Sequence, residues 1–331
     1  MKVAILSYEG VIKSSVEGPA EIFGNIGRLY EMMKGEPLKI IFDVDIIHAE
    51  HNILSKQRYN QKELKPLAEK DNYDLVIITA MQPQHLETVL TRETAVQNWI
   101  IKQYTSGATM ASICVGSFLF AATGILNHKH ATTHWFFQEL FRSKFPLVHL
   151  QDGKIITSQG KIYTCGGAFS FTTFIMYLIE KYCGHEVAVL ASKMYMINIH
   201  QQGQDSFTVF QYQHQHNDDI IAEAQSYIEK NFSKNISIES LASKSNMSVR
   251  QFIRRFETAT SNRPLEYLQR VRVDAAKKMF ESKNKTVNEV AYECAYEDAS
   301  FFRKIFKRHT GLSPTEYKEK FGQNFLSVAV K

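Results

Sequence analysis

The sequence has few cysteines, few prolines and no long apolar run. Its 331 residues contain 4 cysteines and 7 prolines. The cysteines form no C-x-x-C pair, which excludes a small disulfide-stapled scaffold and favours a reduced setting. No segment approaches the ~20 consecutive apolar residues that a membrane span requires, and the apolar start is too short for a signal peptide. We therefore expect a cytoplasmic protein without a membrane partner.

The sequence also lacks net charge over its first two thirds. Residues 1–216 contain 19 Lys and Arg against 19 Asp and Glu, whereas residues 217–331 contain 20 against 15. The whole formal charge of +5 therefore lies in the last third. The length suggests about two domains. A neutral body with a basic appendage indicates that the appendage meets a polyanion.

Residues 1–200 alternate apolar strand-like runs with helical patterns. Strands are predicted at 2–8, 39–49, 74–80, 108–114, 155–158 and 161–164, and helices at 18–34, 94–105, 116–123 and 168–182. The run at 74–80 is apolar throughout, as in a strand covered on both faces. This alternation predicts an α/β domain with a mostly parallel sheet.

The periodicity stops between residues 201 and 216. This segment is polar and Gln-rich, so we expect a linker. Its three aromatic residues, Phe207, Phe210 and Tyr212, indicate that it packs against something. His214 and His216 have no Cys, Asp or Glu at supporting spacing, which favours a solvated linker over a metal site. The sequence predicts no metal and no cofactor.

Residues 217–331 are predicted to be all-helical and contain an internal repeat. Phe252 and Phe256 recur as Phe302 and Phe306 at an offset of 50, whereas the upstream offset is 49, so the second unit has one extra turn residue. Each unit is a short helix, a turn and a helix with inward-facing phenylalanines, which is a helix-turn-helix pattern. The predicted helices are 218–232, 237–245, 248–259, 264–282, 286–294, 298–309 and 313–321, with N-cap candidates Asp218, Ser237, Ser248, Thr286, Asp298 and Ser313.

The second helix of each repeat is basic away from its phenylalanines. A repeated helical hairpin with a solvated basic face is the simpler interpretation. The short turns, the polar helix N-termini and the duplication favour DNA, because a recognition helix puts its N-terminal residues on base edges and its cations on phosphates. Two such helices, joined by one long helix, could enter major grooves about 34 Å apart.

This repeat, with the ending G-x-S-P-x-x-Y at 311–317, resembles the DNA-binding domain of the AraC/XylS family over residues 217–331. The resemblance implies double-stranded promoter DNA as a partner, with RNA polymerase as a second one. The family usually has Gly in the second turn where this chain has Ala295, which fits at some cost if its φ is positive. The implied base or backbone contacts are Ser248, Arg250, Gln251 and Arg254 in the first recognition helix and Ala299, Ser300, Arg303 and Lys304 in the second, with Lys307 and Arg308 on phosphates.

In the first domain, Ser112–Ser117 lies where a strand gives way to a helix. A cysteine at such a turn forms a nucleophile elbow. We expect the Cys114 sulfur to be exposed at the carboxyl end of the sheet, with the following helix favouring the thiolate. The downstream His134 could approach it. A small, buried, apolar cysteine is the alternative, and position alone does not decide between them.

These stretches, with EGPAEIFG at 17–24 and ITSQGKIYTCGGA at 156–168, resemble the PfpI/ThiJ-like domain of the class I glutamine amidotransferase-like fold. The resemblance implies a flavodoxin-like, doubly wound sheet, and its fusion to an AraC domain is the architecture of GlxA-type regulators. Catalytic relatives place an acid where this chain has Ser15, with Glu17 two residues later. The usual Gly-Gly after the third strand is replaced by Ala80 and Met81, which weakens an oxyanion site.

The resemblance thus implies a DNA-binding regulator with a sensor domain at 1–200, a linker at 201–216 and the DNA-binding domain at 217–331. The expected ligand pocket comprises Ser15, Glu17, Cys114, Val115 and His134, with Cys114 and His134 as vestiges and no catalytic residue. A small effector and a homodimer through the first domain are the expected partners. Two alternatives stay open: a Cys114-dependent hydrolase or glyoxalase-like enzyme carrying a DNA-binding module, and a redox sensor, for which the sequence indicates no partner cysteine.

Overall fold

The structure is a computed structural model that divides into two compact units, Met1–Gln204 and Asp205–Lys331. The predicted domain boundaries at residues 200 and 216 stay a prediction. The described residues are 1–48, 64–67, 71–92, 94–198, 203–210, 212–214, 216–282 and 285–322.

The first unit is built on a seven-stranded sheet in the order β3-β2-β1-β4-β5-β9-β8. Every neighbouring pair is parallel except the β8–β9 hairpin. The chain order reverses between β1 and β4, as in a doubly wound sheet, which confirms the predicted flavodoxin-like α/β fold. The strands are β1 Lys2–Ser7, β2 Asp43–His48, β3 Lys65–Pro66, β4 Leu75–Ile78, β5 Thr109–Ile113, β8 Ile156–Gln159 and β9 Ile162–Cys165, and a separate pair joins β6 His130–Ala131 to β7 His149–Leu150.

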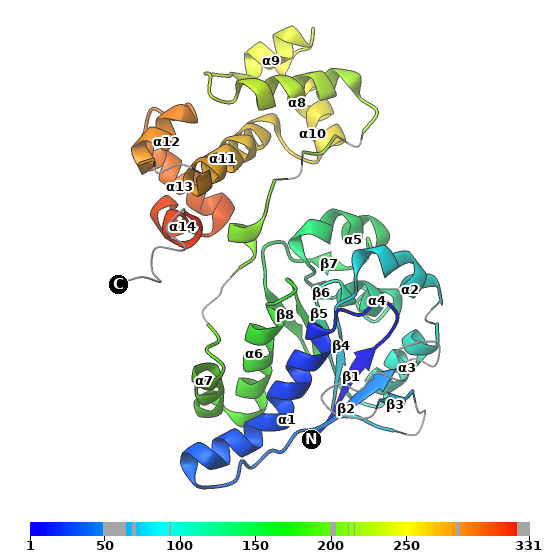
Figure 1. Cartoon of the computed structure of the whole chain (residues 1–331). Coiled ribbons are helices and arrows are strands. Elements are labelled where there is room, and N and C mark those ends of the chain that lie inside the picture. Colours follow the sequence, from blue (N-terminus) through cyan, green and yellow to red (C-terminus); the bar gives the residue numbers. More distant parts are fainter. Residues whose placement is uncertain are drawn as a thin grey trace. The chain divides into compact units, whose positions relative to one another are not determined.

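Helices cover both faces of this sheet (Figure 1), so β4 and β5 are buried along their whole length. One layer holds α1 Ser14–Lys34, α6 Phe171–Cys183 and α7 His185–Met194, and the other holds α2 Leu86–Arg92, α3 Thr94–Thr105 and α4 Gly116–Ala122. The sequence pattern did not predict the helices α2, α7 and α5 (Gln138–Lys144). The predicted strand at 39–49 was too long at its start, since β2 begins at Asp43.

The second unit consists of the predicted short helices. They are α8 Asp219–Asn231, α9 Ile238–Lys244, α10 Val249–Thr260, α11 Pro264–Ser282, α12 Val287–Glu293, α13 Ala299–Thr310 and α14 Pro314–Phe321. All six predicted N-cap side chains accept a hydrogen bond from a backbone N–H in the first turn. Local capping chemistry therefore defines where most of these helices begin.

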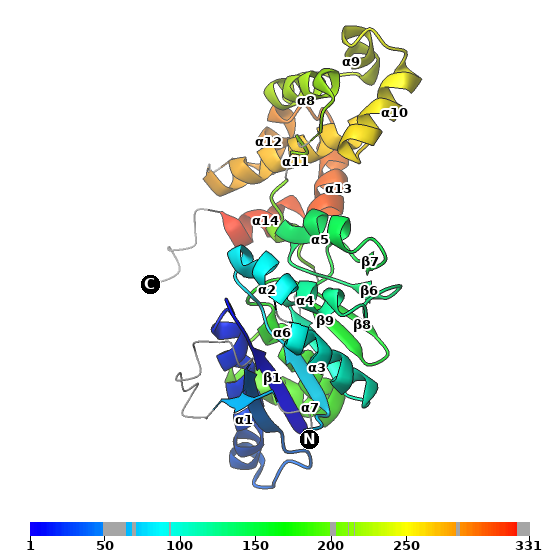
Figure 2. The ribbon, with the colours of Figure 1, turned by 90° about the vertical axis from the view of Figure 1, so that its right-hand side faces the viewer.

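The long helix α11 joins two helical groups, α8–α10 and α12–α14 (Figures 1 and 2). Each group has its own apolar cluster, and α11 contributes to both. Phe252, Phe256, Phe302 and Phe306 are fully buried, which confirms them as core residues. The sequence repeat is thus a repeat of packing units.

The aromatic residues of the polar segment before α8 pack as expected. Phe207 lies in the short turn η4 (Asp205–Phe207), and its ring centroid is 5.5 Å from that of Phe321. Phe210 lies 5.3 Å from Tyr267 in the core between α8 and α11. Among the described helices none is long and apolar enough to cross a membrane.

Candidate nucleic-acid interface and cysteine elbow

Each helix-turn-helix passes through one left-handed backbone residue. In the first turn this residue is Asn246, with φ 53°, and in the second it is Ala295, with φ 57°. The first turn has four residues between its helices and the second has five, as the change of offset predicted. The positive φ of Ala295 is the strained conformation expected where relatives use glycine.

The N-termini of the two recognition helices are capped by their own side chains. Ser248 Oγ accepts from the backbone N–H of Gln251 at 3.3 Å, and Asp298 Oδ1 accepts from that of Ser300 at 2.7 Å. Ser248 therefore spends one acceptor position on the helix and keeps its hydroxyl proton for another partner. The caps fix the first turn of α10, which holds Arg250 and Gln251, and the first turn of α13, which holds Ala299 and Ser300.

Some basic side chains of the two recognition helices have no ion pair, whereas others bind a neighbouring side chain. In the described part of the chain, the exposed Arg250, Arg254, Lys304 and Lys307 have no ion pair. Unpaired cations on two recognition helices are what phosphate binding requires, because their charge is free for a polyanion. The engaged ones are Arg255, which is paired with Asp218, Arg303, which donates to Asn288, and Arg308, which donates to Gln269.

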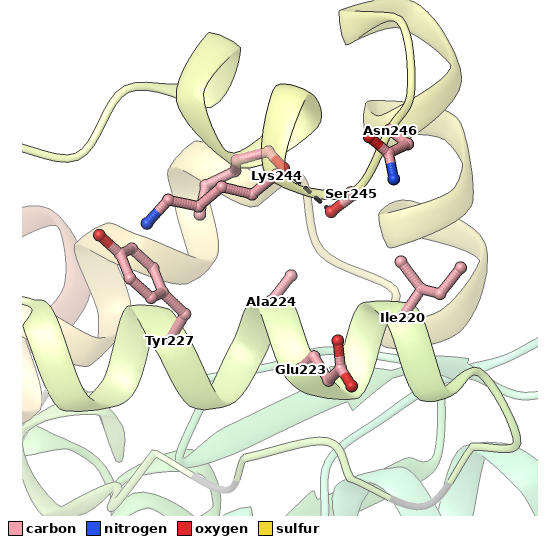
Figure 3. Close-up of a pocket in the computed structure, with 8 residues that line it drawn as sticks. Ile220, Glu223, Ala224, Tyr227, Lys244, Ser245 and Asn246 are labelled. Carbon is pink, nitrogen blue, oxygen red and sulfur yellow. Dashed lines mark hydrogen bonds between the residues drawn. The ribbon is translucent and has the colours of Figure 1, made fainter.

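Another cation, the exposed Lys244, lines a groove between α8 and the end of α9. Its amino group lies 3.5 Å from the centroid of the Tyr227 ring (Figure 3). The nearby Lys244 ammonium group holds the pKa of the Tyr227 hydroxyl below its ordinary value. The contact holds α9 against α8 as a cation–π pair, so Lys244 supports the first motif from behind and is not one of the unpaired cations.

The cysteine elbow in the first unit is present as a strained turn. Cys114 has φ 54° at the end of β5, and its N–H donates to the carbonyl oxygen of Cys165 on β9 at 2.6 Å. A Cβ on Gly116 would lie 2.2 Å from the carbonyl oxygen of Thr79. Glycine is therefore required for α4 to approach the end of β4 this closely.

The predicted exposure of the Cys114 sulfur is wrong. Only 2% of the residue is exposed, and burial raises its pKa to about 12. The thiol is thus protonated at neutral pH, contrary to the expected thiolate. Thr133 and Ser117 cover the turn, since both hydroxyls donate to the Cys114 carbonyl oxygen. Desolvation raises the pKa of this thiol more than the neighbouring backbone N–H groups of Val115 and Gly167 lower it.

The sequence pattern did not reveal that a second cysteine lies beside Cys114. Cys165 ends β9, which pairs with β5, and it is fully buried beside Cys114. Burial and the nearby Cys114 thiol raise its pKa well above the ordinary value. The two cysteines are 51 positions apart in the sequence, so only the strand pairing could have revealed their proximity.

The residue at the acid position has a structural partner. The fully buried Ser15 accepts a hydrogen bond from the N–H of Ala80 at 3.0 Å and donates to the carbonyl oxygen of Ile12 at 2.7 Å. The amide of the altered loop after β4 is therefore occupied within the protein. Of the other predicted pocket residues, Val115 is buried and Glu17 is half-buried.

His134 caps the short turn η3 (Trp135–Phe137). Its Nδ1 accepts from the N–H of Phe136 at 3.2 Å, and its ring lies 5.4 Å from Trp135 and 5.9 Å from Phe137. Burial lowers its pKa, so the imidazole is neutral at neutral pH. The structure thus gives His134 a role in its own loop, and its Nδ1 is already used there.

The residue most closely tied to this loop is Gln204, which the sequence pattern did not single out. Its side chain donates to the carbonyl oxygens of Thr133 and Lys154 and accepts from the N–H of Trp135. Gly166 makes room for it, since a Cβ there would lie 2.1 Å from Gln204 Nε2. Burial of one glutamine within a polar segment leaves no periodic signal.

Comparison with known proteins agrees with this architecture. The model of the DJ-1/PfpI family matches residues 1–180, and that of a helix-turn-helix domain matches residues 241–320. The chain belongs to the DJ-1/PfpI family, and it carries a helix-turn-helix domain of the AraC type. Both resemblances inferred from the sequence are thereby confirmed.

Two similar proteins are transcriptional regulators of Pseudomonas aeruginosa. GbdR is 22% identical over 218 residues, covering 66% of this chain and 59% of that protein. CdhR is 22% identical over 258 residues, covering 76% and 73%. The chain thus spans 59% of the length of GbdR. A crystal structure of a putative transcriptional regulator from Vibrio parahaemolyticus has a TM-score of 0.48 at 20% identity, covering 59% of this chain and 98% of that chain.

Proposed function

We propose that the protein is a sequence-specific, DNA-binding transcription regulator. The observation that carries this proposal is the pair of capped recognition helices, α10 and α13, each with unpaired exposed cations. The joining helix α11 gives the two motifs a fixed connection, which suits reading two successive major grooves. The names of GbdR and CdhR as transcriptional regulators support it.

The proposed contacts follow the two helices. Residues at the N-termini face base edges, and the cations further along neutralise phosphates. Ser248, Arg250, Gln251 and Arg254 act in α10, and Ala299, Ser300, Arg303, Lys304, Lys307 and Arg308 act in α13. The DNA-bound protein would present a surface to RNA polymerase.

Within this proposal, the first unit senses a small molecule and dimerises rather than catalysing a reaction. A buried, protonated Cys114 is a poor nucleophile, and the Ala80 amide is already bound to Ser15. Both observations argue against acyl transfer. In the proposed pocket, Ser15, Cys114 and Val115 are nearly fully buried, so the half-buried Glu17 and His134 are the polar groups nearest to solvent.

The test is DNA binding by the full chain over a range of salt concentrations. Arg254→Ala and Lys304→Ala should each weaken binding about tenfold and reduce the salt slope by about one. Lys193→Ala, an exposed cation of α7 in the other unit, serves as the matched control and should change neither value. Affinity that does not fall with salt, or that survives both substitutions, contradicts the proposal.

A Cys114-dependent enzyme remains the second candidate, because the strained φ of 54° is the conformation of a nucleophile elbow. The pKa of about 12 predicts that Cys114 in the native protein resists iodoacetamide at pH 7.5 and reacts only as the pH approaches that value. Cys114→Ser should still regulate a reporter gene normally. Amidase or glyoxalase turnover that disappears in Cys114→Ser would instead establish the enzyme.

A further inference from the structure

The two recognition helices present different chemistry at equivalent positions. The offset of 50 aligns Phe302 with Phe252, both fully buried, and therefore aligns Phe301 with Gln251. Gln251 is an exposed polar residue in the first turn of α10, whereas Phe301 is a phenylalanine with 49% of its surface exposed in the first turn of α13. A large apolar side chain thus occupies a position where its counterpart is suited to hydrogen-bonding a base.

The ring of Phe301 is supported from behind. Its centroid lies 6.1 Å from that of Tyr296, which is 6% exposed and lies beneath the guanidinium group of Arg272. The next residue, Phe302, also contacts Tyr296, at 5.4 Å. A buried, fixed neighbour limits the rotamers of the half-exposed ring, so its exposed edge is held at the N-terminus of α13.

The surroundings of the exposed edge indicate what it meets. Lys304, three positions along the same face of α13, and Lys307 on the same helix are exposed and have no ion pair within the described residues, so α13 suits a polyanion. Tyr292 is more exposed, at 77%, but it lies on the preceding helix α12 and not on the recognition helix. In the major groove, the 5-methyl group of thymine is the apolar group that a base pair offers.

We propose that Phe301 reads the 5-methyl group of a thymine in the second half of the DNA site. Arg250 and Gln251 are suited to guanine and adenine through bidentate hydrogen bonds, so the two halves of the site are read by different means. Ala299 adds a small apolar side chain beside the large one of Phe301, on the same turn of α13. This inference rests on the proposed DNA-binding function and names a specificity determinant within it.

The experiment uses the full chain and duplexes selected by it from a random-sequence pool. Each thymine of the selected site is replaced in turn by deoxyuridine, which removes the methyl group and keeps the hydrogen-bonding edge. At one or two positions in one half-site, the wild-type protein should bind about fourfold more weakly, which corresponds to the burial of about one methyl group. Phe301→Ala should bind thymine and uracil duplexes equally.

Two matched variants separate this role from others. Gln251→Ala should lose affinity but keep the preference for thymine, and Phe301→Leu should retain part of it. Phe301→Ala should still fold, with only a small loss of thermal stability, because about half of the residue is already exposed. A wild-type protein indifferent to uracil, or a Phe301→Ala variant that still prefers thymine, overturns the inference. Failure to select any salt-sensitive site instead overturns the proposed function itself.

Discussion

At the scale of single residues, the clearest constraint in the first unit is the lack of a side chain at Gly116. A methyl group there would lie 2.2 Å from the Thr79 oxygen and 2.8 Å from the Ile78 oxygen, both backbone atoms that cannot move aside. We predict that Gly116→Ala lowers the free energy of unfolding by about 2–3 kcal/mol, measured by urea denaturation. The elbow would distort before it could accommodate the methyl group.

Gly24 provides the matched control for this substitution. It lies inside α1, where an added Cβ meets no atom within 4 Å. Gly24→Ala should therefore raise the free energy of unfolding by about 0.5–1 kcal/mol, through the higher helix propensity of alanine. Equal effects of the two substitutions would mean that the close approach of α4 to β4 is not a real constraint.

At the scale of elements, the second helix-turn-helix carries more backbone strain in its turn than the first one, whose left-handed residue is an asparagine. Ala295 holds a positive φ that costs an L-residue about 1–2 kcal/mol. We predict that Ala295→Gly raises the free energy of unfolding by about 0.5–1 kcal/mol, after the entropy of glycine in the unfolded chain is subtracted. Asn246→Gly should gain less, because asparagine tolerates this conformation. Ala275→Gly, in the interior of α11, should lose about 1 kcal/mol, and a similar loss for Ala295→Gly would contradict the assigned strain.

The elements also explain which features the sequence could predict. The recognition helices depend on neighbours within a few positions, such as the Ser248 and Asp298 caps and phenylalanines four apart, so local patterns were sufficient. The state of Cys114 depends on Cys165 and Thr133, which reach it from other parts of the chain. The position of the elbow was therefore predicted correctly, whereas local sequence could not decide between the exposed sulfur and the buried, apolar cysteine that the structure shows.

At the scale of the whole molecule, the chain holds separate apolar cores. The cluster of the first unit contains residues between Val3 and Ala191, and the two clusters of the second contain residues between Ile221 and Tyr317, with no shared buried member among the described residues. Because each unit buries its own core, we expect two unfolding transitions in calorimetry. Phe174→Ala should lower the midpoint temperature of only one transition, and Phe306→Ala that of only the other. Each substitution should lower the free energy of unfolding of its own unit by about 3–5 kcal/mol.

The same experiment separates ligand binding from DNA binding. A compound that binds one folded unit stabilises the transition of that unit alone, by an amount set by its concentration relative to Kd. A selected DNA duplex should therefore raise the midpoint temperature of the transition that Phe306→Ala lowers. An effector should raise the midpoint temperature of the transition that Phe174→Ala lowers. A single transition moved by both variants would mean that the units unfold as one. In that case the neutral first unit and the basic second unit would share one folding equilibrium, and ligand and DNA would be coupled through it.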